Sequence, residues 1–239
     1  MIKDVRYIKN ILLGVAHVNL FGDIGWDVDG NQFAKELNYL IDDYNIDEIY
    51  IHINSGGGEV FSGLSIVSVI RNSSKPITCI IEGVAASMAG VIAVAGGTVK
   101  MVDYGKLMVH NASGGNPEDE FVKKALDNIN DILRGIFTKR GIADESIKNF
   151  MDNETWFSAD EAKNLGLIDE IISVPVKVRT LNKLEILNKL NISNKMDEQK
   201  IMELLGVSTP EEIQAAIENL IAQLNEYKTK EKKMEDACK

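Results

Sequence analysis

Apolar and polar residues form short blocks along the first 176 residues, and their period changes repeatedly between two and about 3.6. Blocks of alternating or continuous apolar residues predict strands at 11–21, 47–53 and 77–82. Blocks with apolar residues three or four apart, or with small apolar residues throughout, predict helices at 31–44, 59–71 and 87–95. This alternation predicts an α/β fold with parallel strands joined by right-handed crossovers.

The same pattern continues further along the chain. We expect two short strands within 98–109, separated by a turn at Asp103–Gly105, and a strand at 167–174. Asn116 followed by Pro117 predicts the start of a long amphipathic helix that ends near Arg140. Two shorter helices are predicted at 144–151 and 159–165.

Composition divides the chain near residue 176. Residues 1–176 contain 15 basic and 25 acidic residues, which gives −10, whereas residues 177–239 contain 11 of each. The first part also has 18 of the 19 glycines. We therefore predict an α/β domain at 1–176 and a charged, mostly helical segment at 177–239, where Thr209–Glu212 forms a capping box. The apolar side of that helix fits either a partner or the domain itself.

Charge and cysteine content exclude several classes of protein. A net charge of −10 lacks the basic patch of a nucleic-acid-binding protein. Two cysteines, Cys79 and Cys238, are too few for a disulfide framework. No apolar run reaches the ~18 residues of a membrane span, and the first residues lack the apolar centre of a signal peptide. We expect a soluble protein of a reducing compartment.

The loop Asn54–Gly58 is the first candidate for chemistry, because it follows a predicted strand and precedes a predicted helix. Its three glycines allow close approach of the backbone to a ligand. The Lys-Ser/Thr pair of a phosphate loop is absent, since Glu59 and Val60 follow. An oxyanion hole made of backbone N–H groups is the functional interpretation, and a tight turn is an equal alternative.

Ser87 is the second candidate, at the junction of a predicted strand and an apolar helix among small neighbours. A nucleophilic serine needs a base, and the chain has three histidines. His17 and His52 lie inside predicted strands and are interpreted as structural. His110 lies at a strand end, where ligands bind in α/β sheets, and is the preferred base. Taken alone, a serine in such a stretch is more often a helix cap or a small packing residue, and a lone histidine is more often structural.

A third group, a carboxylate that orients the histidine, has two candidates close together. Asp152 and Glu154 both precede Trp156-Phe157-Ser158. Either acid could instead carry charge for the start of the helix predicted at 159–165.

Together, the strings YIHINSGGG, GVAASMAG, MVHNASG and ETWFSADEAKNLGLIDEI resemble the Clp protease proteolytic subunits. The similarity covers roughly residues 10–175 with the four motifs in the family's order, and it is strongest to the Clp-related head maturation proteases of tailed phages and prophages. The resemblance implies a serine endopeptidase with the parallel-sheet spiral of β-β-α units that Clp proteases share with crotonases. It implies neither a metal nor a cofactor.

Residue by residue, the resemblance assigns the nucleophile to Ser87 and the base to His110. It places the acid at Glu154, where the family usually has aspartate, with Asp152 as the fallback. The oxyanion donors fall on the N–H groups of Gly58 and Met88. Gly56 departs from the proline that the family often has before two glycines, although the donors themselves are retained.

The resemblance also implies partners. The helix at 117–140 corresponds to the handle that joins two rings of identical subunits, and Ala112–Asn116 would grip an extended substrate. We expect capsid or scaffold protein as substrate, in the cytoplasm of a bacterial host or inside procapsids, with residues 177–239 as a delivery segment. Whether an ATPase assists is left open.

Three alternatives remain at this point. The chain could be a housekeeping Clp subunit that works with an ATPase, which the C-terminal segment disfavours. It could be a crotonase-type acyl-CoA enzyme, although Glu82 is not in the loop that such chemistry needs. It could also be a degenerate assembly protein without activity, which Glu154 in place of aspartate keeps open.

Overall fold

The computed structural model divides the chain into two compact units, Met1–Pro175 and Val176–Lys239. Structure is described for residues 5–116 and 118–173 of the first unit, and for a few positions of the second: 202, 205–209, 212, 213, 215, 216, 218 and 219. Most of the helical segment predicted for 177–239 therefore lies outside the described residues.

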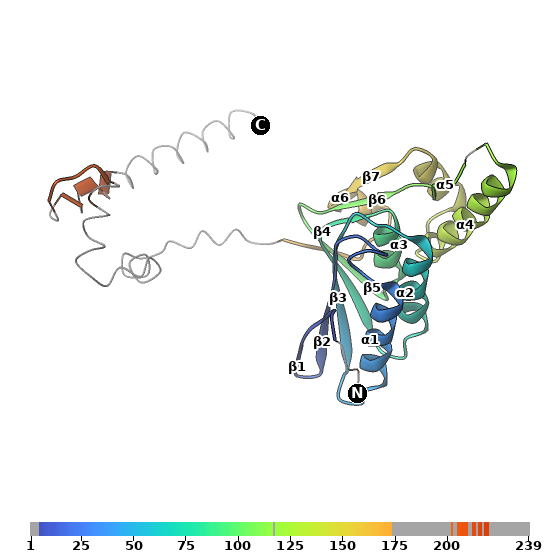
Figure 1. Ribbon diagram of the computed structural model, residues 1–239, viewed down its shortest axis with the longest axis horizontal. Helices are drawn as coiled ribbons and strands as arrows, with labels where there is room; N and C mark the ends of the chain where they lie inside the picture. Colours follow the sequence, from blue (N-terminus) through green and yellow to red (C-terminus); the bar gives the residue numbers. More distant parts are fainter. Residues whose placement is uncertain are drawn as a thin grey trace. The chain divides into compact units, whose positions relative to one another are not determined.

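Within the described residues, eight strands form one sheet (Figure 1). The strands are β1(Ile8–Leu12), β2(Val15–Phe21), β3(Glu48–Ser55), β4(Ile77–Ala86), β5(Thr98–Val102), β6(Lys106–Val109), β7(Thr155–Ser158) and β8(Glu170–Ile172). The order is β1-β2-β3-β4-β5-β8, and every pair from β2 to β8 along this path is parallel. The predicted α/β class with parallel strands is confirmed.

Strand β4 divides its partners along its length. Its first half, Thr78–Ile81, pairs with β5, whereas its second half, Val84–Ala86, pairs with β6. Strand β6 in turn pairs antiparallel with β7. This fork brings the ends of β4 and β6 side by side, immediately before Ser87 and His110.

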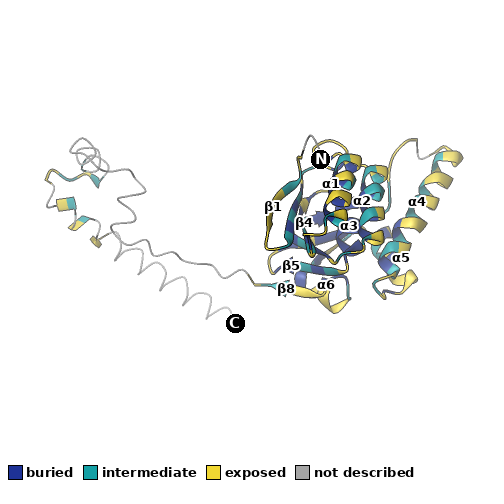
Figure 2. Ribbon diagram, turned by 90° about the horizontal axis from the view of Figure 1, so that it is seen from below, coloured by how far each residue is buried: buried dark blue, intermediate teal, exposed yellow. Residues whose placement is uncertain are grey.

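Six helices belong to this unit within the described residues. They are α1(Gly30–Asp42), α2(Val60–Asn72), α3(Met88–Ala95), α4(Glu120–Thr138), α5(Asp144–Asp152) and α6(Ala159–Asn164). Helices α1, α2 and α3 pack side by side over one face of the sheet, and the residues between the two layers are buried (Figure 2). Every residue of the apolar helix α3 is buried, as its sequence predicts. The opposite face of β2, β3 and β4 carries polar side chains.

The single strand predicted at 11–21 is wrong, because this segment contains a hairpin. Strands β1 and β2 pair antiparallel across a turn at Leu13 and Gly14, whose φ angles are 50° and 79°. Two consecutive left-handed residues make the tight turn that matches strand twist. Leu13 is 91% exposed. An apolar residue at a turn hides the boundary from an analysis based on hydrophobic pattern.

Two further boundaries differ from the prediction. Helix α4 begins at Glu120 rather than at Pro117, because the Asp119 side chain accepts a hydrogen bond from the Phe121 N–H and caps the helix there. Strand β7 was not predicted, since its four residues are too few to show a period of their own.

Glu36 joins the N-terminal segment to helix α1. Its side chain is fully buried, and its carboxylate accepts hydrogen bonds from the backbone N–H groups of Arg6, Tyr7 and Ile8 at 2.9, 2.9 and 3.1 Å. Tyr7 also packs against Phe33, with ring centroids 5.1 Å apart. A buried carboxylate is tolerated here because backbone donors replace its water shell.

We predict that Glu36→Ala lowers the free energy of unfolding by about 2–3 kcal/mol, since it removes charge-assisted hydrogen bonds in a buried place. Chemical denaturation followed by circular dichroism measures the change. Lys35→Ala is the control, because Lys35 is the exposed neighbour on the same helix. Equal effects of the two substitutions would show that helix propensity, not the carboxylate, is responsible.

Candidate active site

Ser87 occupies the turn between β4 and α3 in a strained backbone conformation, with φ 54° and ψ −126°. Non-glycine residues rarely adopt this region, and such strain is typical of functional sites. The turn is fixed on both sides, because the Ser87 N–H donates to the Met108 carbonyl at 3.0 Å and the Ser87 carbonyl accepts from the Val91 N–H at 3.2 Å. The Ser87 hydroxyl makes no capping hydrogen bond to α3, so the alternative role as a helix cap is not realised.

His110 meets Ser87 across the pairing of β4 with β6. Ala86 is paired with Met108, and Ser87 and His110 follow these residues within one or two positions. The His110 Nε2 atom lies 2.7 Å from the Ser87 Oγ atom. This distance is within the range for proton transfer between a nucleophile and its base. Both residues are half-buried.

The glycine loop lies against the same turn. A β-carbon on Gly57 would be 2.7 Å from the Ser87 β-carbon and 3.1 Å from the Met88 nitrogen, so only glycine allows this approach. Ile24 holds the loop, since its N–H donates to the Gly57 carbonyl at 2.8 Å and its carbonyl accepts from the Glu59 N–H at 2.9 Å.

The backbone N–H groups predicted as oxyanion donors are unoccupied among the described residues: neither Gly58 nor Met88 donates a hydrogen bond there. The Met88 N–H is also the first of helix α3, where the helix dipole favours a negative atom. Unpaired donors beside a nucleophile are what an oxyanion hole requires. Their role stays a prediction.

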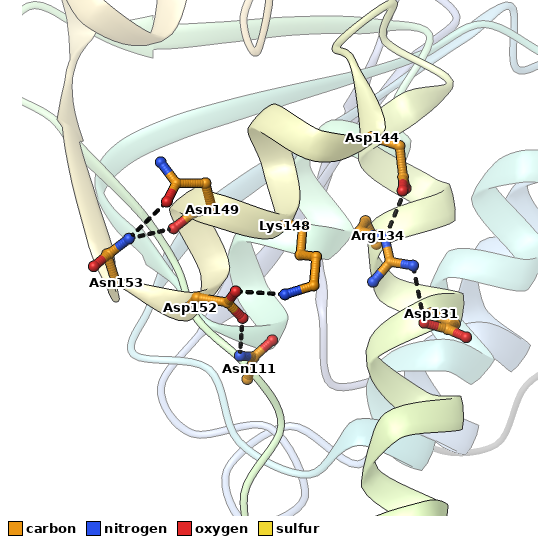
Figure 3. A network of polar contacts seen from close by, with 8 residues as sticks. All are labelled: Asn111, Asp131, Arg134, Asp144, Lys148, Asn149, Asp152 and Asn153. Atoms are coloured by element: carbon orange, nitrogen blue, oxygen red, sulfur yellow. Dashed lines mark hydrogen bonds and ion pairs between the residues drawn. The ribbon is translucent and has the colours of Figure 1, made fainter.

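The carboxylate of Asp152 is hydrogen-bonded to Asn111 and Lys148 (Figure 3). Its Oδ1 atom accepts from the Asn111 amide at 2.9 Å, and its Oδ2 atom accepts from Lys148 Nζ at 2.6 Å. The hydrogen bonds from Lys148 and Asn111 hold the pKa of the Asp152 carboxyl below its usual range. Asp152 therefore contacts the residue after His110 and not His110 itself.

Glu154 follows α5 and has a left-handed backbone, with φ 45°. The last pair between β6 and β7 joins Val109 with Thr155, so one further step along the same register places His110 opposite Glu154. Among the described residues, no hydrogen bond or ion pair joins His110 to Glu154 or to Asp152. The assignment of the acid stays a prediction.

A small pocket opens beside the serine and the histidine. Apart from Ser87 and His110 its walls are apolar, formed by Val60, Met88, Val91, Val109, Ala112, Leu133, Phe137 and Met151. The pocket is bounded by helices α3, α4 and α5 and by the end of β6. It can receive a small apolar group next to the hydroxyl.

Sequence reasoning missed several polar residues around the site. Asn111 and Lys148 were not singled out, although Asn111 directly follows His110 at a strand end, which is a recognisable signal. The structure also brings His17, His52 and Glu82 together, which the sequence treats as separate residues. No group of three or more metal-ligating side chains was found among the described residues, and no described helix is long and apolar enough to span a membrane.

We predict that Ser87→Gly is more stable than Ser87→Ala by about 1–2 kcal/mol, because glycine adopts φ 54° without the strain that a β-carbon causes. Thermal unfolding of the two variants measures the difference. Ser68 is an exposed residue within helix α2, and there the glycine variant should be less stable than the alanine variant by about 1 kcal/mol. Glycine destabilising both positions would contradict the strained turn.

A serine in a strained strand-to-helix turn, hydrogen-bonded to a histidine and flanked by unpaired backbone N–H groups, is the arrangement of a serine hydrolase. The family model described as Clp protease matches residues 3–175. The chain is 33% identical over 171 residues to the ATP-dependent Clp protease proteolytic subunit 2 of Prochlorococcus marinus (strain MIT 9312), covering 68% of this chain and 84% of the relative. It is 31% identical to subunit 3 of Synechococcus sp. (strain CC9605), covering 68% and 86%.

The chain therefore belongs to the Clp protease family and is a serine-type endopeptidase with the α/β fold of that family. The family match favours this class over the acyl-CoA enzymes that share the spiral fold. The family match ends at residue 175 and so lies within the first unit.

Proposed function

We propose that the chain cleaves peptide bonds by acyl transfer, with Ser87 as nucleophile and His110 as general base. The observation that carries this proposal is the 2.7 Å contact between Ser87 Oγ and His110 Nε2. His110 takes the hydroxyl proton as Ser87 attacks the peptide carbonyl, and then gives the proton to the leaving amine. Water, activated by the same histidine, hydrolyses the acyl-enzyme and regenerates Ser87.

The N–H groups of Gly58 and Met88 stabilise the negative oxygen that forms during both steps. Their contribution depends on being fixed before the reaction, and the contacts of Ile24 on the glycine loop supply that rigidity. The apolar pocket next to Ser87 receives the side chain on the acyl side of the cut bond. We therefore expect cleavage after small apolar residues.

Assembly into rings of identical subunits is supported by helix α4. Much of this helix is exposed in the unit itself (Figure 2), and two of its large apolar residues, Phe121 and Ile132, are 88% and 52% exposed. Exposed apolar residues on one helix can mark a protein contact. Ala112 lines the pocket beside Ser87, and the segment Ala112–Asn116 that it begins would hold an extended substrate as an added strand.

For the biological role we propose head maturation in a phage or prophage, with capsid or scaffold protein as the substrate. This role is supported by the 64 residues, 176–239, that extend beyond the family match. Those residues are neutral overall and rich in charge, as assembly segments often are. The alternative is a housekeeping subunit that works with an ATPase, which the names of the relatives favour, since both are called ATP-dependent.

The peptidase proposal is tested by reaction with a serine-directed fluorophosphonate, followed by mapping of the adduct. We expect labelling at Ser87 in the wild type and its loss in His110→Ala. Lys106→Ala is the matched control, because Lys106 is the exposed first residue of β6, the strand that leads to His110. This variant should label normally. Labelling that persists in His110→Ala, or an adduct at another serine, would refute the assignment.

The biological role needs a separate experiment. The chain is co-expressed with the capsid and scaffold proteins of its own element, with and without residues 178–239, and the procapsids are purified. Cleaved capsid or scaffold that depends on Ser87 and on the C-terminal segment supports head maturation. Normal packaging of the truncated protease would contradict a delivery role, and cleavage that needs an added ATPase would favour the housekeeping alternative.

A further inference from the structure

Three titratable side chains outside the proposed mechanism are in contact on the polar face of the sheet. His52 on β3 lies between Glu82 on β4 and His17 on β2. The His52 Nδ1 atom is 2.6 Å from Glu82 Oε1, and the His52 Nε2 atom is 2.9 Å from His17 Nδ1. Tyr50 stacks on His17 with ring centroids 5.3 Å apart. The three groups form one continuous chain of hydrogen bonds across three strands.

This chain of contacts lies where the backbone pairing of β3 with β4 is interrupted. Regular pairing ends at Ile53 with Ile81 and resumes at Ser55 with Ala85, so β4 has extra residues in between. Glu82 is one of those residues. Asn54 also bridges the gap, because its side-chain oxygen accepts from the Val84 N–H at 3.1 Å. Side chains thus hold the two strands together where the ladder does not.

Both strands lead directly from the interruption into the active site. Strand β3 continues into the loop with Gly57 and Gly58, and β4 continues into Ser87 and Met88. The two N–H groups of the proposed oxyanion hole, those of Gly58 and Met88, therefore follow different strands. Their spacing depends on how firmly β3 and β4 are joined just before them, and a misplacement of about 1 Å can reduce a catalytic rate ~100-fold.

We propose that His52, held between Glu82 and His17, is a positioning residue of the active site that fixes the glycine loop relative to Ser87. The proposal rests on the proposed peptidase function. His52 touches neither substrate nor reacting atoms, so it acts only through the two strands. Contacts on the polar face of the sheet thereby control the ends of β3 and β4 that lead into the active site.

The contact between His17 and His52 stays intact when one proton is added to the pair. The bond between the two imidazoles needs one donor and one acceptor nitrogen, so either histidine can be the cation while the other stays neutral. A second proton turns both nitrogens into donors and breaks the contact between His17 and His52. His52 therefore stops fixing the glycine loop relative to Ser87 when both His17 and His52 are protonated.

The surroundings place this loss on the acid side of the ordinary histidine range. Burial, then His52 and Lys9 on β1, lower the pKa of His17 from 6.5. Further charges on this face come from Glu48 on β3, Lys100 on β5 and Glu170 on β8; Lys100 and Glu170 form an ion pair of 2.6 Å. Because the folded protein disfavours protonated His17, the doubly protonated state, and with it the loss of the contact, is reached only below pH 6.5.

If His52 only helped to hold β3 against β4, then removing any other side-chain bond between these strands should have the same effect. The chain offers such a bond as a matched control. At the other end of the same two strands, Thr78 Oγ1 on β4 donates to Glu48 Oε1 on β3 at 3.1 Å, where backbone pairing is regular. Thr78→Val removes this cross-strand bond without changing the volume of the side chain. It tests general adhesion of β3 to β4 away from the interruption.

The experiment measures kcat and KM on a short peptide ester at pH 8 for wild type, His52→Phe, Glu82→Gln and Thr78→Val. We expect His52→Phe to lower kcat about 10-fold or more with KM within about twofold. Glu82→Gln keeps the acceptor oxygen and should lose less, and Thr78→Val should match wild type. Equal losses in His52→Phe and Thr78→Val would overturn the proposal.

His17→Asn tests the proton dependence, because its amide can still donate to His52 but does not titrate. The ratio of wild-type kcat to His17→Asn kcat should be close to one at pH 8 and fall several-fold between pH 6.5 and pH 5. A ratio that stays constant over this range would overturn the proton-dependent part.

Amide NMR shifts of Gly58 and Met88 separate this proposal from the peptidase proposal. We expect them to move in His52→Phe and not in Thr78→Val, whether or not the protein turns over substrate. Unmoved shifts overturn the positioning role. Absence of Ser87 labelling in the wild type would overturn the peptidase function alone.

Discussion

Replacing Ser87 or His110 by alanine should each lower kcat by about 10⁶, and replacing both should lower it no further. The reason is the direct contact of 2.7 Å between the hydroxyl and the imidazole. Each group works only through the other, since the serine needs a proton acceptor and, without Ser87, no acyl-enzyme forms for His110 and water to hydrolyse. Steady-state peptide hydrolysis by the two single variants and the double variant measures this non-additivity.

The controls for this cycle must retain the fold and the assembly. Thermal unfolding and sedimentation of each variant show whether the subunits still fold and associate. A residual rate about 10³–10⁴ times the uncatalysed rate should persist, because the oxyanion donors and the apolar pocket beside Ser87 remain. Additive losses from the two single substitutions would mean that Ser87 and His110 do not act as one unit.

The second large effect concerns the acid. We predict that Glu154→Gln lowers kcat by about 10⁴, as loss of the orienting carboxylate does in a serine protease triad. Extending the register of β6 and β7 by one pair would set Glu154 opposite His110. No hydrogen bond or ion pair of the exposed Glu154 carboxylate is found among the described residues. The pH profile of kcat for wild type and variant measures the effect.

Asp152→Asn is the matched comparison. Both oxygens of Asp152 are already occupied by Asn111 and Lys148, so this substitution should lower kcat less than about tenfold. Asn111→Ala, which removes the link between Asp152 and the segment after His110, should resemble it. If instead Asp152→Asn is the severe variant and Glu154→Gln is close to wild type, the acid is Asp152.

The α/β class and the position of most elements follow from the sequence because buried strands and amphipathic helices have distinct periods. The pattern predicts α3 within one residue, since its residues are small, apolar and preceded by a strand. It fails for β1 and β2, where Leu13 occupies a turn, and for the end of β4, where Gly83 interrupts the apolar run although the strand continues to Ala86. In both places tertiary pairing overrides the local pattern.

The proposed site is predictable only in part. Ser87 and His110 are predicted from their places at strand ends and from the family resemblance, and the structure places their side chains in contact. The acid could not be decided, because the choice between Asp152 and Glu154 depends on side-chain partners that have no signature in the sequence. His17 and His52 were interpreted as structural for the same reason: their contact joins residues 35 positions apart.

The fork of strand β4 ties the geometry of the catalytic pair to the short strands β6 and β7. The first half of β4 pairs with β3 and β5 in the centre of the sheet, whereas its second half pairs with β6, a strand of four residues that pairs in turn with the equally short β7. Leu107 and Val109 of β6 are buried in the hydrophobic core, so packing compensates for the few hydrogen bonds of this strand. Core packing beneath β6 therefore sets the position of His110 relative to Ser87.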